Sequence, residues 1–281
     1  MRILNDKKIE EILKCPICGN NMAVPNGRAS LVCFGERKHC YDFAASGYVN
    51  LCSPGQSGGG DSAQAVRARS QFLNKGYYRP VAEALARMAV KHGRTDGVLL
   101  DAGCGEGYYS NALAEEGFSV IGVDLSKFAV DASSKRLARS QKENFLFAAA
   151  SVFKLPVADA SVSVVTNVFA PCAEEEYTRV LESNGVLIVA WAGERHLMGL
   201  KEAVYDTAHT NSERADLPDQ MKKIDEIRIV YTIELDSNEE IKSLFAMTPY
   251  YWRTSIDDMG KLDGLQTLNT EVDIIVSVYQ K

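Results

Sequence analysis

From residue 97 onward, short apolar runs rich in β-branched residues alternate with stretches of helical patterning. The strand-like runs are Val98–Leu100, Ser119–Asp124, Phe145–Ala149, Val162–Phe169 and Val186–Trp191. Helical patterns lie between them, near residues 108–116, 126–139, 173–182 and 195–208. This alternation is typical of βαβ units and predicts an α/β fold, with a mostly parallel sheet and helices on both faces. The segments IRIVYTIEL and EVDIIVSVYQ, with a helix around 238–246 between them, predict two further strands.

The residues before this region divide into three parts. Residues 1–52 predict a small loop-and-hairpin module, because the stretch from residue 14 is dense in Cys, Gly and Asn. Residues 53–60, SPGQSGGG, have no capacity to pack and predict a flexible linker. Residues 61–281 predict one domain, which enters through a helix to about Asn74 and a second from about Pro80 to Lys91.

Composition narrows the class of protein. The 281 residues are 46% hydrophobic and 24% charged, as in an average globular protein. No run of about 18 uncharged apolar residues occurs, so the sequence predicts no membrane span. The N-terminal MRILNDKKIEEILK lacks the apolar core of a secretory signal, and seven cysteines are an odd number for a disulfide framework. We therefore expect reduced thiols and a cytoplasmic location.

The net charge of −6 conceals an asymmetry along the chain. Residues 1–91 carry 13 Lys and Arg against 7 Asp and Glu, a net charge of +6. The remaining residues carry 18 against 30, a net charge of −12. A polyanion is therefore expected to meet the N-terminal third of the chain.

A group of cysteines in the N-terminal module has the spacing of a metal site. In Cys15-Pro-Ile-Cys18 the CxxC spacing lets two thiolates converge on one tetrahedral ion. Cys33 follows downstream, and either His39 or Cys40 would complete the four ligands of structural zinc. A redox pair is the alternative, but it belongs at a strand-to-helix junction that this region lacks. A bound ion would also explain how so short a module folds with little core.

A glycine-rich turn follows the first strand of the alternating region. In Asp101-Ala-Gly103-Cys-Gly105-Glu106-Gly107 the glycines allow a tight turn and a close approach of a ligand to the backbone. Asp124, followed by Leu125, ends the next strand, where a carboxylate can hold both ribose hydroxyls. A dinucleotide is the alternative ligand, although its fingerprint is normally GxGxxG. The two acids with this spacing resemble the class I methyltransferases, whose cofactor is S-adenosylmethionine (SAM).

Further motifs narrow this resemblance over essentially the whole chain. They are, in order, CPxC, HCYDFAASGYVNL (39–51), GDSAQAVRARSQFLNKGYYRP (60–80), LDAGCGEGYYS (100–110), VFAPC (168–172), GERHLMGLK (193–201) and MTPYYWR (247–253). The chain resembles the bacterial 23S rRNA (guanine-N1)-methyltransferases. The resemblance implies cofactor contacts from Tyr78, Gly105, Glu106 and His196, beside those expected from Asp101, Gly103, Asp124 and Leu125.

The resemblance also implies zinc ligands at Cys15, Cys18, Cys33 and His39, which makes residues 1–52 a zinc-binding module for RNA recognition. The chain departs from the family pattern at one point. Similar proteins space the second ligand pair as CxxxH, whereas this chain has CxxxxxH. His39 begins the HxxD…GYVNL motif, which favours it over Cys40.

The reaction implied is methylation of guanine N1 in a hairpin loop of 23S rRNA, where unpaired bases can be splayed out. Asn167 and Phe169, in the loop after the fourth strand, are candidates for contacting the acceptor, and the aromatic residues of PYYW (249–252) would help. The sequence identifies neither the group that takes the N1 proton nor the guanine that is modified. The family also suggests a homodimer.

Three alternatives stay open. Cys172 after Pro171 echoes the nucleophile of RNA cytosine-5 methyltransferases, although no clear Glu-Asn-Val partner motif is present. A non-enzymatic zinc protein that binds RNA would keep the fold without using the cofactor. A methyltransferase with a small-molecule substrate would require neither the zinc module nor the basic front.

Overall fold

The computed structural model describes residues 4–25, 29–52, 59–212, 217–251 and 253–281. Within these residues the chain forms one sheet of three strands and one of eight. Most of the predicted linker, residues 53–58, lies outside the described residues. No helix in the described part of the chain combines the length and apolar character needed to cross a membrane.

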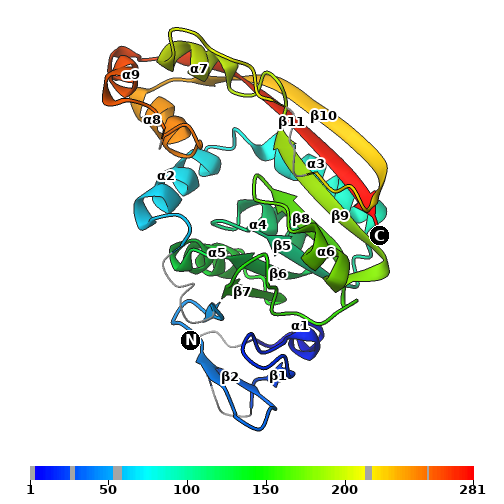
Figure 1. Cartoon of the computed structure of the whole chain (residues 1–281). Coiled ribbons are helices and arrows are strands. Elements are labelled where there is room, and N and C mark those ends of the chain that lie inside the picture. The colour runs from blue at the N-terminus through cyan, green and yellow to red at the C-terminus, as the bar shows by residue number, and fades with distance from the viewer. Residues whose placement is uncertain (1–3, 26–28, 53–58, 213–216, 252) are drawn as a thin grey trace.

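The larger sheet has the strand order β10-β11-β9-β8-β5-β6-β7-β4 (Figure 1). Its strands are β4 (Val49–Asn50), β5 (Val98–Ala102), β6 (Ser119–Asp124), β7 (Phe145–Ala149), β8 (Val162–Val168), β9 (Leu181–Ala192), β10 (Lys222–Leu235) and β11 (Leu268–Gln280). The strands from β9 to β4 are parallel, and β11 runs antiparallel to both β9 and β10. The prediction of a mostly parallel sheet is confirmed.

Helices cover both faces of this sheet (Figure 1). They are α2 (Ala63–Asn74), α3 (Arg79–His92), α4 (Tyr108–Glu115), α5 (Lys127–Arg139), α6 (Glu174–Val180), α7 (Met198–Val204), α8 (Asn238–Ala246) and α9 (Ile256–Gly260), with a 3-10 turn at Lys261–Gly264. Successive residues of a strand face opposite sides, so Leu99 joins the core under α3, α4 and α5 whereas Leu100 joins the core under α6. Helix α7 begins later than predicted because Leu197 has a left-handed φ of 58°.

The N-terminal module consists of α1 (Lys7–Ile12) and an antiparallel sheet of β1 (Met22–Ala23), β2 (Ser30–Cys33) and β3 (Cys40–Asp42). This module packs directly on the larger sheet. Val49 of β4 pairs with Ala148 of β7, so the module supplies the edge strand. Ile9 and Leu13 are fully buried in the same core as Leu100. The module and the sheet therefore share a core, while the predicted domain boundary at residue 52 stays a prediction.

Candidate functional site

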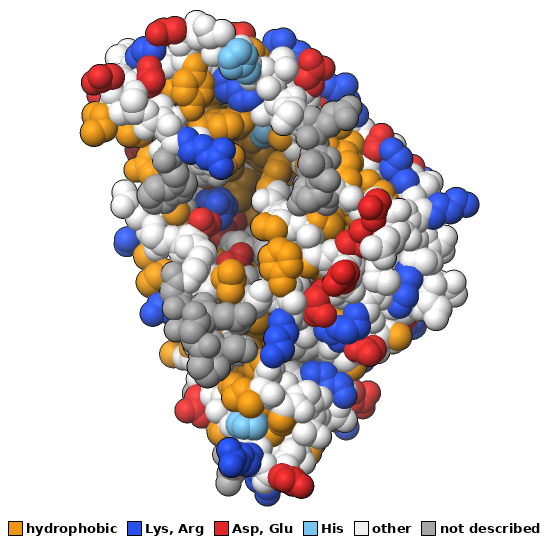
Figure 2. Space-filling view, viewed as in Figure 1, with side chains coloured by type: hydrophobic (Ala, Val, Ile, Leu, Met, Phe, Trp, Pro, Cys, Tyr) orange, Lys and Arg blue, Asp and Glu red, His pale blue; other side chains and the backbone are white. Residues whose placement is uncertain are grey.

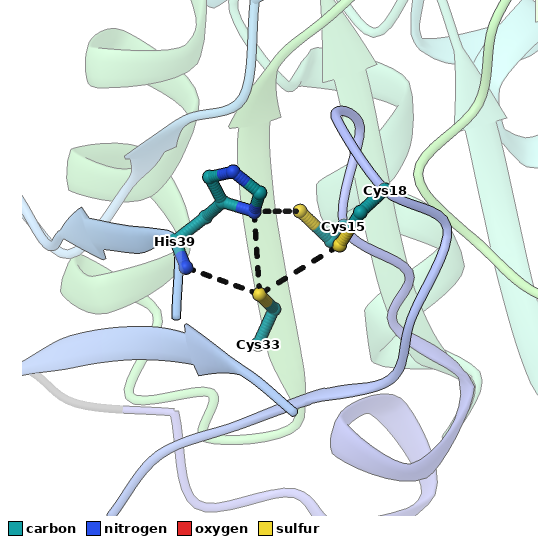
Figure 3. A group of neighbouring side chains, drawn as sticks. All are labelled: Cys15, Cys18, Cys33 and His39. Carbon is teal, nitrogen blue, oxygen red and sulfur yellow. Dashed lines mark hydrogen bonds between the residues drawn. The ribbon is translucent and has the colours of Figure 1, made fainter. Parts of the chain in front are cut away.

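Four predicted metal ligands converge in the N-terminal module (Figure 3). The ligand atoms of Cys15, Cys18, Cys33 and His39 all lie within 4.8 Å of one another. His39 Nδ1 lies 3.5 Å from Cys15 Sγ and 3.4 Å from Cys33 Sγ, and the Sγ atoms of Cys18 and Cys33 are 3.8 Å apart. Tetrahedral zinc, with bonds of about 2.3 Å to sulfur and about 2.0 Å to nitrogen, would hold two sulfurs about 3.8 Å apart and a sulfur and a nitrogen about 3.5 Å apart. The four side chains therefore fit a zinc ion.

Backbone hydrogen bonds position these ligands. The Cys15 N–H donates to Asn20 O at 2.8 Å, and the His39 N–H donates to Cys33 Sγ at 3.1 Å. Hydrogen bonding from Asn20 lowers the pKa of the Cys18 thiol to about 6, which favours the thiolate that a metal binds. Cys40 is exposed on β3 and lies outside the group, so the fold brings His39 and not Cys40 to the thiols.

The glycine-rich turn joins β5 to α4 at the carboxyl edge of the sheet. Gly103 and Gly105 have φ angles of 81° and 54°, in the left-handed region that favours glycine. A Cβ on Gly103 would lie 2.4 Å from the Cβ of Ala170, in the loop after β8. Among the described residues, a Cβ on Gly105 would meet only Arg69 Nη1, at 3.8 Å. The turn therefore packs against the loop after β8 at Gly103 and is open to a ligand at Gly105.

Asp124 lies beside this open backbone, at the end of β6. Its Oδ2 accepts from the Gly105 N–H at 3.1 Å, and its Oδ1 accepts from the Ser126 N–H at 2.8 Å. Each carboxylate oxygen has a second lone pair, so Asp124 can still accept hydrogen bonds from two hydroxyl groups. Leu125 is half-buried, and its Cδ1 is 3.6 Å from where a Cβ on Gly59 would lie, so the last residues of the predicted linker pass this side chain.

Asp101 lies beneath the turn rather than on its open side. Both of its oxygens accept hydrogen bonds, from Ser110 Oγ and from Thr166 Oγ1. Burial raises the pKa of this carboxyl to about 6, against the lowering effect of those two hydroxyl donors. Asp101 therefore supports the turn from below, and its predicted contact with the cofactor stays a prediction.

One carboxylate oxygen of Glu106 is buried and receives no hydrogen bond from the described residues. Its side chain is 2% exposed, and its Oε2 pairs with Arg136 and accepts from Ser70 Oγ. Its Oε1 has no hydrogen-bond partner within the described residues, and a buried unpaired acceptor is costly. A ligand with hydroxyl and amino groups would satisfy this oxygen and fit the open backbone at Gly105. The chemistry of the site thus fits SAM.

An aromatic cluster lies beside the turn. Tyr78 at the start of α3 and His196 after β9 are both buried, and Tyr78 Oη lies 3.3 Å from His196 Nε2. The ring of Phe169, in the loop after β8, stacks on His196 with centroids 6.0 Å apart and planes 15° apart. Phe169 is 46% exposed and has a left-handed φ of 53°. Figure 2 shows a hollow between α2 and the β8–β9 side of the molecule, in which hydrophobic side chains gather.

The protonation of His196 follows from its neighbours. The Asp273 N–H donates to His196 Nδ1 at 3.3 Å, so the neutral ring carries its proton on Nε2, toward Tyr78. Burial lowers the pKa of His196 to about 4, which keeps the ring neutral at pH 7. The Asp273 carboxylate binds Arg228 through two contacts of 2.8 Å and accepts from the Arg195 N–H at 2.9 Å. Sequence reasoning missed Asp273, although a carboxylate within the apolar run VDIIV is a usable signal.

Of the residues predicted to contact the acceptor base, some are buried in the protein and others are exposed or lie outside the described residues. Asn167 is fully buried, and its Nδ2 donates to Pro171 O at 2.9 Å, so it shapes the loop that carries Phe169. Cys172 is half-buried and packs against the core under α6, whereas Phe169 stacks on His196. Of PYYW, Tyr250 Oη donates to Asn211 Oδ1 at 3.0 Å, and Trp252 lies outside the described residues.

Comparisons with known proteins agree with this geometry. A family model described as a methyltransferase domain matches residues 94–246. A solved structure titled "The Structure of a Putative Type II Methyltransferase from Anaeromyxobacter dehalogenans" has a TM-score of 0.52 at 18% identity, covering 70% of this chain and 95% of that one. The sheet and the glycine-rich turn, together with these matches, define a class I methyltransferase.

Relatives of known name specify the family. A "Putative 23S rRNA (guanine-N(1)-)-methyltransferase" of Micromonospora griseorubida is 30% identical, covering 86% of this chain and 87% of its own. The "23S rRNA (guanine(748)-N(1))-methyltransferase" of Streptomyces fradiae is 28% identical, covering 96% and 98%. A relative in Bacillus subtilis strain 168, also named as a putative enzyme of this kind, is 28% identical over 96% and 97%. The chain belongs to the 23S rRNA (guanine-N1)-methyltransferase family, as its motifs predict.

Proposed function

We propose that this chain transfers a methyl group from SAM to N1 of a guanine in a hairpin loop of 23S rRNA. The observation that carries the proposal is similarity along nearly the whole chain to relatives that bear this name. The zinc cluster and the basic N-terminal third of the chain favour RNA over a small-molecule acceptor. Since ribosomal RNA is made in the cytoplasm, the proposal also gives the enzyme a cytoplasmic location.

The residues at the carboxyl edge would hold the cofactor. SAM supplies an electrophilic methyl group on a sulfonium, and alignment of the acceptor provides much of the catalysis. Asp124 would bind the ribose hydroxyls next to Leu125, and the open backbone of Gly105 would lie against the cofactor. Glu106 Oε1 would accept from a polar hydrogen of the ligand. Tyr78 and His196 would close the same site from the other side.

The half-exposed ring of Phe169 is suited to stack on the target guanine. The guanine must lose its N1 proton before or during attack. His196 does not take this proton, because Nδ1 already accepts from Asp273 and Nε2 carries a hydrogen. Its neutral ring instead supports Phe169 from behind.

Cys15, Cys18, Cys33 and His39 would bind structural zinc. Four protein ligands fill a tetrahedral ion, which leaves no open position for a reacting water. Zinc therefore serves folding and RNA recognition in this proposal. The homodimer suggested by the family stays part of the prediction.

The test is to incubate the full chain with SAM and an unmodified 23S rRNA hairpin fragment, then to analyse the digested nucleosides by mass spectrometry. 1-Methylguanosine is expected, and primer extension would locate the base. 5-Methylcytidine would instead make Cys172 a nucleophile. If calorimetry detects SAM binding but no methylated nucleoside forms, the rRNA substrate is wrong. If SAM does not bind, a non-enzymatic RNA-binding protein is favoured.

A further inference from the structure

A groove runs between the zinc module and the larger sheet. Its volume is about 750 Å³. One wall is the zinc loop, residues 14–19, and the other is the segment 154–159 after β7, with Glu176 and Arg179 of α6 beside it. Backbone hydrogen bonds join the two walls, since the Lys14 N–H donates to Pro156 O at 2.9 Å. The groove is therefore a built feature of the fold and not a gap between loose segments.

Each wall carries a lysine whose charge is not neutralised. Lys14 Nζ bonds to the neutral Asn21 Oδ1 at 2.6 Å. Lys154 is exposed on the opposite wall, and within the described residues neither lysine forms an ion pair. Arg179, by contrast, is paired with both Glu176 and Asp159. The two lysines therefore give the groove a net attraction for anionic groups.

An exposed apolar side chain lies in the zinc-side wall, and a second one directly precedes the opposite wall in the chain. Ile17 lines the zinc side and is 54% exposed. Phe153, the residue before Lys154, is 62% exposed. Positive charges that contact phosphates, interleaved with apolar or aromatic side chains that contact bases, are the combination that holds single-stranded nucleic acid.

The sheet-side wall leads back along the chain toward the candidate cofactor site. Residues 154–159 follow β7, and just after β7 the Ala150 N–H donates to the main-chain oxygen of Asp124 at 3.0 Å. Helix α6, which carries Glu176 and Arg179, follows the loop that contains Phe169. A few residues of chain therefore join the groove to elements that form the candidate cofactor site.

We propose that this groove binds one strand of the substrate RNA. Lys14 and Lys154 contact its phosphates, and Ile17 and Phe153 pack against its bases. The inference rests on the proposed function, which supplies the RNA. The proposal also assigns a role to the candidate zinc site. Cys15 lines the groove, so a bound ion would fix the wall that carries Ile17.

The test measures RNA affinity without turnover. The full chain, saturated with S-adenosylhomocysteine, is titrated by fluorescence anisotropy with the unmodified 23S rRNA hairpin over a series of salt concentrations. The Lys14→Gln/Lys154→Gln variant is compared with a matched control, Lys142→Gln/Lys222→Gln, whose lysines do not line the groove. Each lost phosphate contact lowers the slope of log K against log salt by about 0.7, so the groove variant is expected to lose about 1.4. A slope equal to that of the wild type and the control overturns the proposal.

The apolar contacts have a separate readout. Phe153→Ser is expected to weaken binding by about 5- to 100-fold with an unchanged salt slope, because stacking does not release counterions. Phe128→Ser, at an exposed phenylalanine on α5, is the control. Zinc content and thermal unfolding of each variant verify folding. Equal affinities of both variants refute the base contact.

Product analysis separates this inference from the proposed function. If the wild type forms 1-methylguanosine while the groove variants bind as it does, the groove proposal fails and the function stands. If the groove variants lose affinity but no 1-methylguanosine forms, the function fails and the groove stands. A wild type that does not bind the hairpin overturns both.

Discussion

Replacing Gly103 by Ala tests how the glycine-rich turn positions the loop that carries Phe169. A left-handed φ, here 81°, costs a residue with a Cβ about 1–2 kcal/mol. The new Cβ would also lie 2.4 Å from the Cβ of Ala170, and overpacking of this kind costs about 1–3 kcal/mol. Gly103→Ala should therefore lower the free energy of unfolding by about 2–5 kcal/mol, measured by guanidinium denaturation. Because the overlap displaces Ala170, methyl transfer should fall more than cofactor affinity.

Two controls separate the backbone cost from the overlap. Gly117 has a φ of 98°, and a Cβ added there would have no atom of the described residues within 4 Å. Gly117→Ala should therefore lose only the backbone contribution, about 1–2 kcal/mol. In a double-mutant cycle, Ala170→Gly should restore about 1–3 kcal/mol to Gly103→Ala by removing the overlapping methyl group. The reasoning is refuted if Gly103→Ala and Gly117→Ala are equally stable, or if the cycle gives no coupling.

Three further predictions concern the binding of zinc, the dependence of stability on pH, and the thiol of Cys172. His39→Ala should lose bound zinc while Cys40→Ser keeps it, as measured by metal content; the opposite result would exchange their roles. Burial lowers the pKa of His196 from 6.5 to about 4. As the pH falls from 7 to 4, the histidine of the unfolded chain is therefore protonated before that of the folded chain, which favours unfolding. The wild type should then lose up to about 3 kcal/mol more stability between pH 7 and 4 than His196→Gln, and parallel pH curves would contradict this. Cys172→Ser should keep full methyl transfer, whereas an inactive but folded variant would support covalent catalysis.

The bounds of two parallel strands of the larger sheet could be predicted closely from the sequence. Ser119–Asp124 and Phe145–Ala149 agree with β6 and β7 because each is a continuous apolar run buried on both faces. The sequence does not predict strand β4, because two residues show no periodicity and Val49 pairs with Ala148, which lies far along the chain. Long-range pairing of this kind leaves no local signal.

In the candidate sites, too, features that depend on local sequence could be predicted, whereas features that depend on contacts between distant segments could not. The candidate zinc ligands could be predicted from local spacing together with the family motif, and the fold gathers Cys15, Cys18, Cys33 and His39. The support of His196 by Asp273 depends on two segments meeting across the sheet, so neither segment shows it alone. The burial of Asn167 likewise depends on Pro171 O and Tyr177, which the sequence cannot place in space.

The pairing of β4 with β7 sets an order of assembly during synthesis. The cysteine–histidine cluster spans residues 15–39 and can close as soon as that segment leaves the ribosome. Val49 must wait until Ala148 has been made, and closing so long a loop is slow. Until then Ile9 and Leu13, which are buried in the finished protein, lack the sheet that covers them. The first part of the chain to be translated is therefore among the last to dock, and early zinc binding would protect it from aggregation in the interval.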